Sequence, residues 1–478
     1  MPTNLKARTP VWAACIVASA AALRLVPLLT RPLWYDEIFT VWAARLAPSR
    51  LIELLRMDSG PPLFYLTCRP FVLAAERLAG SDLLARLPSL AAGLALLAAA
   101  AALPEAGSRL RYLALVAFSP LLILYAAEAR PYALLGLEGL ALFLLVLRAP
   151  PTRGRLAAVA ALSAAALYTH YLALFLVAAL AGVALARRRG RAAAALLAGA
   201  ALFAPWLPVL AGQPAAATAW MREPLLESVA GFLCALGGAG RLPAPFGGPL
   251  PAALAWAGAA IGVLALAAIA SAPGESAARD AGAVTLLALL GILAASFLRP
   301  VAFAGRSELL ILPIWLFGLA EAGAVRPLAR AAAVAVAVAG AVACLFTLSG
   351  LPCEAPAYAA FASRLAREAR AGDVVFAGGA FYLPARLAAD RGALSARLIG
   401  LPAALEAHPG WIPAVLPGSA ETSLLTQKTR ALAPPARAWL LLPRLLATPQ
   451  LLDAFAGGSQ VSILADRPEA LLFVRDSR

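Results

Sequence analysis

Long apolar runs recur through the first 350 residues, and this feature most restricts what the chain can fold into. About eleven runs each approach the ~20 residues that a helix needs to cross a bilayer. Hydrophobic residues make up 62% of the chain and charged residues 14%, against about 45–50% and 25% in soluble domains. We therefore predict an all-α polytopic membrane domain. The runs are 11–30, 87–104, 112–127, 131–147, 156–171, 172–186, 192–211, 249–271, 282–298, 308–325 and 330–350.

Arginine clusters between the runs predict the orientation. The run 11–30 is too long for a cleavable signal peptide and reads as a first span with a cytoplasmic N-terminus. If 31–86 forms one long external loop, the later clusters fall on the cytoplasmic side, as the positive-inside rule requires. The chain is then a multi-pass protein of the inner (plasma) membrane. These clusters are 109–111, 148–155, 187–191 and 326–330.

The pattern changes after residue 354. Apolar residues at helical spacing in 355–371 precede short strand-like runs, which predict a small α/β domain over 355–478. With about eleven spans this domain is extracytoplasmic (periplasmic), beside a transmembrane domain over 1–350. The strand-like runs are Val374–Ala377, Trp439–Leu442, Val461–Ala465 and Leu471–Val474.

Several classes of protein are excluded. The five cysteines are scattered without a CxxC pair, which argues against a metal site or a disulfide framework. The sequence has no GxGxxG, P-loop or HExxH motif, so a cytosolic nucleotide-driven reaction has no support. The net charge of +15 reads as a topology signal and not as a nucleic-acid surface. We predict no cofactor; a divalent metal stays possible, without an identified ligand cluster.

Two adjacent carboxylates, Asp36 and Glu37, follow the first span. Asp36 could cap a helix over 38–47 with Glu37 in its first turn, or it could act as a general base on an acceptor. Asp58 has two similar readings: a turn that leads into a helix, or a second functional acid.

Charged and aromatic residues also stand at other span ends. Arg130, in an external hairpin with Glu128 and Tyr132, forms an internal pair or binds an anionic head group. Arg306 has the same two readings. So does Arg24, which is buried in the first span but near enough its outer end to snorkel. The remaining candidates, His170 and Tyr171, close another external hairpin. A histidine there is either functional or only a structural hydrogen-bonding residue.

In order and spacing, these motifs resemble the GT-C type of membrane glycosyltransferase, in the subgroup of protein O-mannosyltransferases, lipid A aminoarabinose transferases and related bacterial enzymes. The resemblance covers roughly 11–350 and departs at Gly60, Phe64 and Ser307, where the subgroup has His, Tyr and Tyr. The motifs are Asp36-Glu37, Asp58-Ser59-Gly60-Pro61-Pro62-Leu63-Phe64-Tyr65, Arg86-Leu87-Pro88-Ser89, Glu128-Ala129-Arg130-Pro131-Tyr132 and Arg306-Ser307.

The resemblance implies transfer of a hexosyl or pentosyl unit from a polyprenyl-phosphate sugar to a glycan, lipid or protein acceptor at the external membrane face, usually with inversion. Asp36 would be the general base beside Glu37, and Asp58 would position the acceptor. Arg130 and Arg306, with Arg24, would hold the lipid phosphate. The other substrate-binding candidates are Glu128, Tyr132, His170 and Tyr171.

Two rival functions remain. A lipid-linked-sugar transporter or flippase would also need many spans and buried arginines. Transporters concentrate their sites near the bilayer midplane, whereas the charged residues of this chain are expected to cluster at one membrane face. A non-catalytic lipid-binding scaffold is suggested by Gly60 alone.

Overall fold

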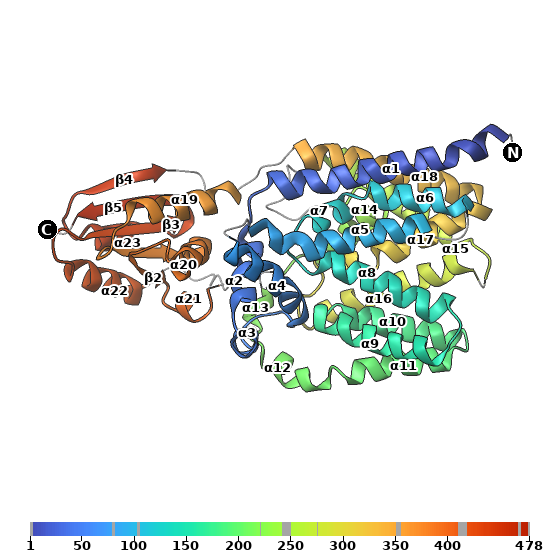
Figure 1. The fold of residues 1–478 in the computed structure, drawn as a ribbon, viewed down its shortest axis with the longest axis horizontal. Helices are drawn as coiled ribbons and strands as arrows, with labels where there is room; N and C mark the ends of the chain where they lie inside the picture. Colours follow the sequence, from blue (N-terminus) through green and yellow to red (C-terminus); the bar gives the residue numbers. More distant parts are fainter. Residues whose placement is uncertain are drawn as a thin grey trace. The chain divides into compact units, whose positions relative to one another are not determined.

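The computed structural model describes residues 3–78, 82–102, 106–219, 221–240, 250–274, 276–349, 355–409, 418–466 and 470–476. Helices account for about 71% of the described residues. The chain folds into two compact units (Figure 1). Met1–Thr30 and Ala47–Leu351 form the membrane unit, and Arg31–Leu46 and Pro352–Arg478 form the sheet unit.

The regular structure of the membrane unit is helical throughout its described residues. Its elements are α1 (Thr3–Thr30), α3 (Pro48–Leu55), α4 (Leu63–Arg77), η1 (Asp82–Arg86), α5 (Leu87–Ala102), α6 (Ala106–Ala117), α7 (Pro120–Ala126), α8 (Tyr132–Phe143), η2 (Leu144–Arg148), α9 (Arg153–Thr169), α10 (Ala173–Ala186), α11 (Gly190–Ala201), η3 (Ala204–Trp206), α12 (Leu207–Gly212), α13 (Ala216–Ala219), α14 (Leu225–Leu236), α15 (Ala252–Ala270), α16 (Ala277–Ser296), η4 (Ser307–Leu310), α17 (Leu312–Val325) and α18 (Pro327–Ser349).

Six helical segments of the described chain are long and apolar enough to cross a bilayer, and one bent pair makes a seventh candidate. The other apolar runs lie on the shorter helices α8, α9, α10 and α17. The count of about eleven crossings and their orientation therefore stay predictions. The six segments are Val11–Thr30, Asp82–Ala102, Gly190–Gly212, Ala252–Ala270, Ala277–Ser296 and Pro327–Phe346.

The run expected as the third span is broken into α6 and α7, which are bent by 61°. Pro120 opens α7 and has no N–H with which to continue the helix. Arg24 of α1 donates to the carbonyls of Val116 and Ala117, at 3.0 and 3.4 Å. The Cys344 thiol of α18 donates to the carbonyl of Phe118 at 3.4 Å. Side chains from two other helices thus satisfy carbonyls that the break leaves open.

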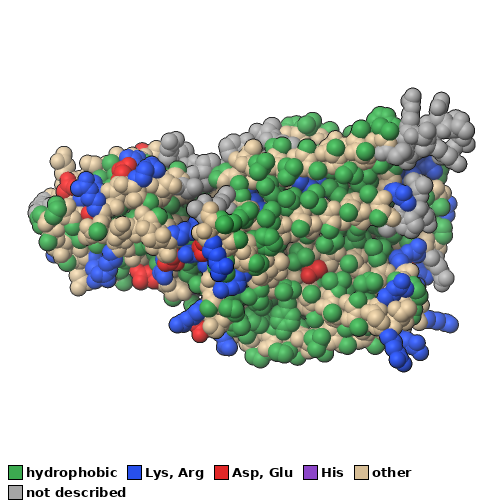
Figure 2. All heavy atoms as spheres, viewed as in Figure 1, with side chains coloured by type: hydrophobic (Ala, Val, Ile, Leu, Met, Phe, Trp, Pro, Cys, Tyr) green, Lys and Arg blue, Asp and Glu red, His purple; other side chains and the backbone are tan. Residues whose placement is uncertain are grey.

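Apolar side chains cover much of the surface of the membrane unit, whereas Lys and Arg gather near the helix ends (Figure 2). Trp256 on α15 is 73% exposed and Val334 on α18 is 57% exposed. An exposed tryptophan and valine on long apolar helices fit contact with lipid, and cations fit the two interfaces.

The sheet unit contains five strands in the order β2-β1-β3-β5-β4. Strands β2, β1 and β3 are parallel, and β5 and β4 continue the sheet antiparallel. The strands are β1 (Val374–Gly378), β2 (Arg397–Leu401), β3 (Arg437–Pro443), β4 (Val461–Asp466) and β5 (Ala470–Asp476). The small sheet predicted for this part of the chain is therefore present.

Successive side chains of each strand point to opposite faces of the sheet. Both faces are apolar here, and helices cover both. Val375 packs in one apolar core with α19 and α20, and Phe376 packs in a second core with α22 and α23. The remaining elements of the unit are α2 (Tyr35–Arg45), α19 (Ala355–Glu368), η5 (Gly379–Phe381), α20 (Tyr382–Asp390), α21 (Ala404–Ala407), α22 (Ser419–Arg430), η6 (Arg444–Leu446) and α23 (Pro449–Ala456).

Helix α2 belongs to the sheet unit although it directly follows α1 in the chain. The indole Nε1 of Trp42 donates to Asp390 Oδ2 at 2.9 Å, and the Phe39 ring lies 5.6 Å from the His408 ring. The segment expected to form one external loop is thus divided: α2 folds with the sheet, and α3 and α4 fold with the membrane unit.

Candidate functional site

Arg130 and Arg306 both interact electrostatically with one side chain of the membrane unit, His170. Arg130 lies between α7 and α8, His170 lies between α9 and α10, and Arg306 precedes α17. The backbone N–H of Leu172 donates to His170 Nδ1 at 3.2 Å, which leaves Nε2 as the donor of the neutral ring. Three of the residues predicted to bind substrate therefore come together from separate loops.

Aromatic rings pack beside these cations. The Tyr132 ring lies 5.4 Å from the His170 ring and 4.8 Å from the Tyr125 ring. The Arg130 Cζ atom lies 6.0 Å from the centre of the Tyr132 ring, within the range of a cation–π contact. Tyr132, a predicted substrate-binding residue, therefore lies beside Arg130 and His170.

Two fully buried carboxylates complete the cluster. Glu128 and Glu308 are both 0% exposed, and both interact electrostatically with Tyr125, as Arg306 does. Glu308 Oε1 accepts a hydrogen bond from the Gly305 amide at 2.7 Å. The cluster therefore combines two arginines with two carboxylates, a combination that lowers the cost of burying either charge.

Side-chain hydrogen bonds fix the backbone around both arginines. Ser89 Oγ donates to the Arg130 carbonyl at 2.9 Å. Ser307 Oγ donates to the Val301 carbonyl at 3.1 Å and accepts from the Phe303 amide at 2.9 Å. Ser307, where the resembling family has Tyr, therefore closes the loop that precedes α17.

Tyr171 connects the α9–α10 hairpin to the loop that carries Asp58. The Tyr171 hydroxyl accepts a hydrogen bond from Trp206 Nε1 at 2.8 Å and interacts electrostatically with Asp58. Gln213 Nε2 donates to the Leu55 carbonyl at 2.7 Å and ties α12 to the end of α3. Because Tyr171 follows His170, one hairpin interacts both with Asp58 and with the two arginines.

The glycine at position 60 leaves room for a side chain. A Cβ built on Gly60 would meet the Tyr65 hydroxyl at 3.7 Å, an ordinary van der Waals distance. The backbone at Gly60 also does not require positive φ. Position 60 therefore has room for a Cβ, which the histidine of the resembling subgroup would need, without backbone strain.

The two adjacent acids, Asp36 and Glu37, lie on α2 of the sheet unit. The helix begins at Tyr35, and the Trp34 amide donates to Glu37 Oε2 at 3.3 Å. Glu37 therefore holds the start of the helix, and the alternative in which Asp36 is the N-cap is wrong. Glu37 is 0% exposed, whereas Asp36 is partly exposed.

Arg24 and Arg86 make structural contacts. Besides the broken helix, Arg24 donates to the carbonyl of Ala20 at 3.0 Å, and its side chain is fully buried. Arg86 is also fully buried and donates to the Leu28 carbonyl at 2.8 Å. These contacts favour a structural role for Arg24 over binding of the lipid phosphate.

No group of three or more His, Cys, Asp or Glu side chains in the described chain could hold a metal ion. We assign no residue to metal binding.

No protein-family model and no curated protein matches the sequence. Two crystal structures of ArnT from Cupriavidus metallidurans match the fold. The apo structure gives a TM-score of 0.62 at 13% identity, covering 97% of this chain and 98% of that chain. The structure bound to undecaprenyl phosphate gives a TM-score of 0.61 with the same identity and coverage. The chain has the ArnT fold.

The likeness to ArnT extends beyond the motifs that carried the sequence resemblance. Those motifs end before residue 350, whereas the ArnT structures match nearly the whole chain, sheet unit included. At 13% identity the match establishes the fold that the resemblance implied. The roles of individual residues must be argued from the contacts of this chain.

Sequence reasoning missed three members of the arginine cluster. Ser89 had a signal, because it ends the Arg-Leu-Pro-Ser motif, but that motif carried no stated role. Glu308 stands two residues after Arg306 and could have been paired with it by position. Tyr125 lies inside an apolar run and had no signal at all.

Proposed function

We propose that the protein is a membrane glycosyltransferase that transfers a sugar from a polyprenyl-phosphate donor to an acceptor. The observation that carries the proposal is the convergence of Arg130 and Arg306 on His170 in a chain with the ArnT fold. One ArnT structure holds undecaprenyl phosphate, a lipid of the donor class that the motifs imply. The acceptor is a glycan, a lipid or a protein.

Arg130 and Arg306 are proposed to bind the donor phosphate. Guanidinium groups offer phosphate charge-assisted, often bidentate hydrogen bonds. Arg306 is 6% exposed, so an anion that joins it is shielded from water. His170 would add a neutral Nε2–H donor, and Tyr132 would hold Arg130 from one side.

Asp36 is proposed to be the general base, because the motif resemblance implies this role for it and because Asp36 is partly exposed whereas Glu37 is fully buried. As the acceptor oxygen or nitrogen attacks the anomeric carbon, its proton passes to the Asp36 carboxylate. The bond from the anomeric carbon to the phosphate oxygen breaks, and the polyprenyl phosphate leaves with the electron pair. A direct displacement of this kind inverts the anomeric centre. Asp58, beside Tyr171, would position the acceptor.

We further propose that the sheet unit lies outside the cytoplasm, with the N-terminus inside. Arginine clusters at alternate span ends support this orientation. Reporter fusions at Gly190 and at Arg478 should report opposite compartments, and the same compartment at both sites would contradict it.

The purified full-length protein, reconstituted in lipid nanodiscs, should be incubated with a panel of radiolabelled polyprenyl-phosphate sugars and candidate acceptors. We expect label to pass from one donor to an acceptor, with release of polyprenyl phosphate. Movement of an intact donor across a liposome bilayer without transfer would instead support a transporter or flippase. Donor binding without transfer to any acceptor would support a scaffold.

A further inference from the structure

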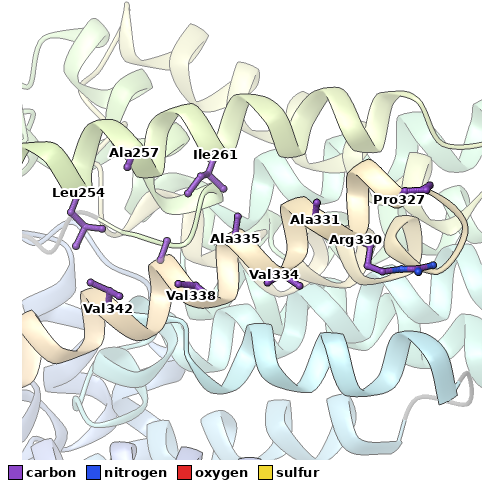
Figure 3. A pocket seen from close by; sticks show the side chains of 11 residues that line it. Leu254, Ala257, Ile261, Pro327, Arg330, Ala331, Val334, Ala335, Val338 and Val342 are labelled. Carbon is purple, nitrogen blue, oxygen red and sulfur yellow. The ribbon is translucent and has the colours of Figure 1, made fainter. Parts of the chain in front are cut away.

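A groove of about 760 Å³ runs between α15 and α18 of the membrane unit (Figure 3). Its walls are apolar, with Ala257 and Ile261 on α15 facing Ala335 and Val338 on α18. The volume lies in the ~300–1,000 Å³ range of small-molecule sites. Its chemistry suits a hydrocarbon chain.

The groove is long and open at the surface of the membrane unit. It extends along α18 from Pro327 to Val342, which is about 22 Å of helix. One leaflet of a bilayer core is about 15 Å thick, so an acyl chain can lie lengthwise in it. Val334 and Val338, which line it, are each 57% exposed, so a lipid can enter sideways.

One end of this apolar groove is positively charged. Arg330 lines that end, and its Nε donates to the Gly323 carbonyl at 3.1 Å. No described residue accepts a hydrogen bond from its two terminal nitrogens. Arg111 interacts electrostatically with Arg330, and within the described chain its Nη2 atom is buried without a partner. Glu321 also interacts electrostatically with Arg111, so this end carries two cations and one carboxylate. The two cations repel each other, and the remaining positive charge favours an anion.

We propose that the groove binds one chain of an anionic phospholipid, with the lipid phosphate on Arg330 near Arg111. Charge complementarity carries this choice: the walls match the chain and the cationic end matches the head group. The site differs from the donor site, because Arg306 precedes the 14-residue helix α17 and Arg330 follows it. A helix of that length separates the two by about 21 Å.

The full-length protein in detergent, titrated with phosphatidylglycerol and followed by native mass spectrometry, tests the proposal. Arg330→Gln should weaken binding about tenfold, the scale of one hydrogen bond to a charged group. Ala335→Trp, which fills the middle of the groove, should remove the bound lipid. Arg191→Gln and Ala260→Trp are matched controls, because both residues are exposed and neither lines the groove.

Equal binding by Arg330→Gln, Ala335→Trp and their controls would overturn the proposal, and so would equal affinity for phosphatidylcholine and phosphatidylglycerol. If Ala335→Trp fails to fold, Val338→Phe at the groove rim provides the same obstruction. Donor binding by Arg330→Gln should match that of the parent. A loss of donor binding in that variant would contradict the separation of the two sites.

Discussion

The two units contribute opposite chemical groups to the proposed reaction. The membrane unit gathers Arg130 and Arg306 at His170, a site suited to an anionic leaving group. The sheet unit carries Asp36 on α2, a carboxylate suited to accepting a proton. In the proposed mechanism the phosphate-binding residues and the general base belong to different units, so variants of each should fail in different ways.

Point variants test this division better than truncation. Deleting the chain after residue 350 would remove Asp390 and His408, against which Trp42 and Phe39 of α2 pack. The apolar face of α2 would then be uncovered, and a loss of activity would not distinguish chemistry from folding.

The largest expected effect is that of Asp36→Asn. Without the general base, turnover should fall about 10²-fold or more, while donor affinity and thermal stability stay close to those of the parent. Glu37→Gln is the matched control, because Gln keeps an oxygen for the Trp34 amide and should lose less activity. Near-normal turnover of Asp36→Asn would remove the base from the mechanism and favour the transporter or scaffold.

Arg130→Gln and Arg306→Gln should show the opposite pattern. Each should weaken donor binding by roughly 1.5–3 kcal/mol, the scale of a hydrogen bond to a charged group, in a titration with polyprenyl phosphate. Arg191→Gln, at an exposed position on α11, should bind the donor normally. Unchanged affinity in both site variants would leave the two arginines with a structural role only.

A smaller effect is expected where α2 meets the rest of the sheet unit. Trp42→Phe removes the hydrogen bond to the Asp390 carboxylate, and a hydrogen bond to a charged group contributes about 1.5–3 kcal/mol. Turnover should fall a few-fold through a less well-held α2, while donor affinity stays unchanged. A double-mutant cycle with Asp390→Asn should show coupling between the two positions; additive effects would argue that this contact does not hold α2.

The smallest effect concerns Asp373 in the sheet unit. Burial alone would raise its pKa, but hydrogen bonds from the Arg370 amide, Trp439 Nε1 and the Arg437 amide, with the charge of Arg437, lower its pKa below the usual range. This stabilisation is present above the ordinary carboxyl pKa of about 3.9 and is lost as pH falls through the lower folded-state value. Acid unfolding of the full-length protein should be shallower in Asp373→Asn, and an unchanged acid profile would contradict this role.

The helices of the membrane unit were largely predictable, because their apolar composition leaves few alternatives. Sequence reasoning missed α14, since Leu225–Leu236 is only 12 residues long and falls short of a bilayer crossing. It also joined α6 to α7, although Pro120 marks the break. Both errors concern helices too short to be read as separate spans.

The site was predictable only residue by residue. Motifs pointed to Arg130, His170 and Arg306, but their meeting depends on how separate helical hairpins pack, which no local pattern reports. The attachment of α2 to the sheet unit was equally hidden. Its partners Asp390 and His408 lie more than 300 residues away in the chain, and nothing near α2 points to them.

That attachment imposes an order on synthesis. Arg31–Leu46 leaves the ribosome about 300 residues before its partners in Pro352–Arg478, which at ~5–20 residues per second is on the order of 15–60 s. During this interval Phe39 and Trp42 lack Asp390 and His408, their contacts in the folded sheet unit. We expect the nascent helix to stay exposed, or to rest on the bilayer surface or a chaperone, until residues 390–408 have been made.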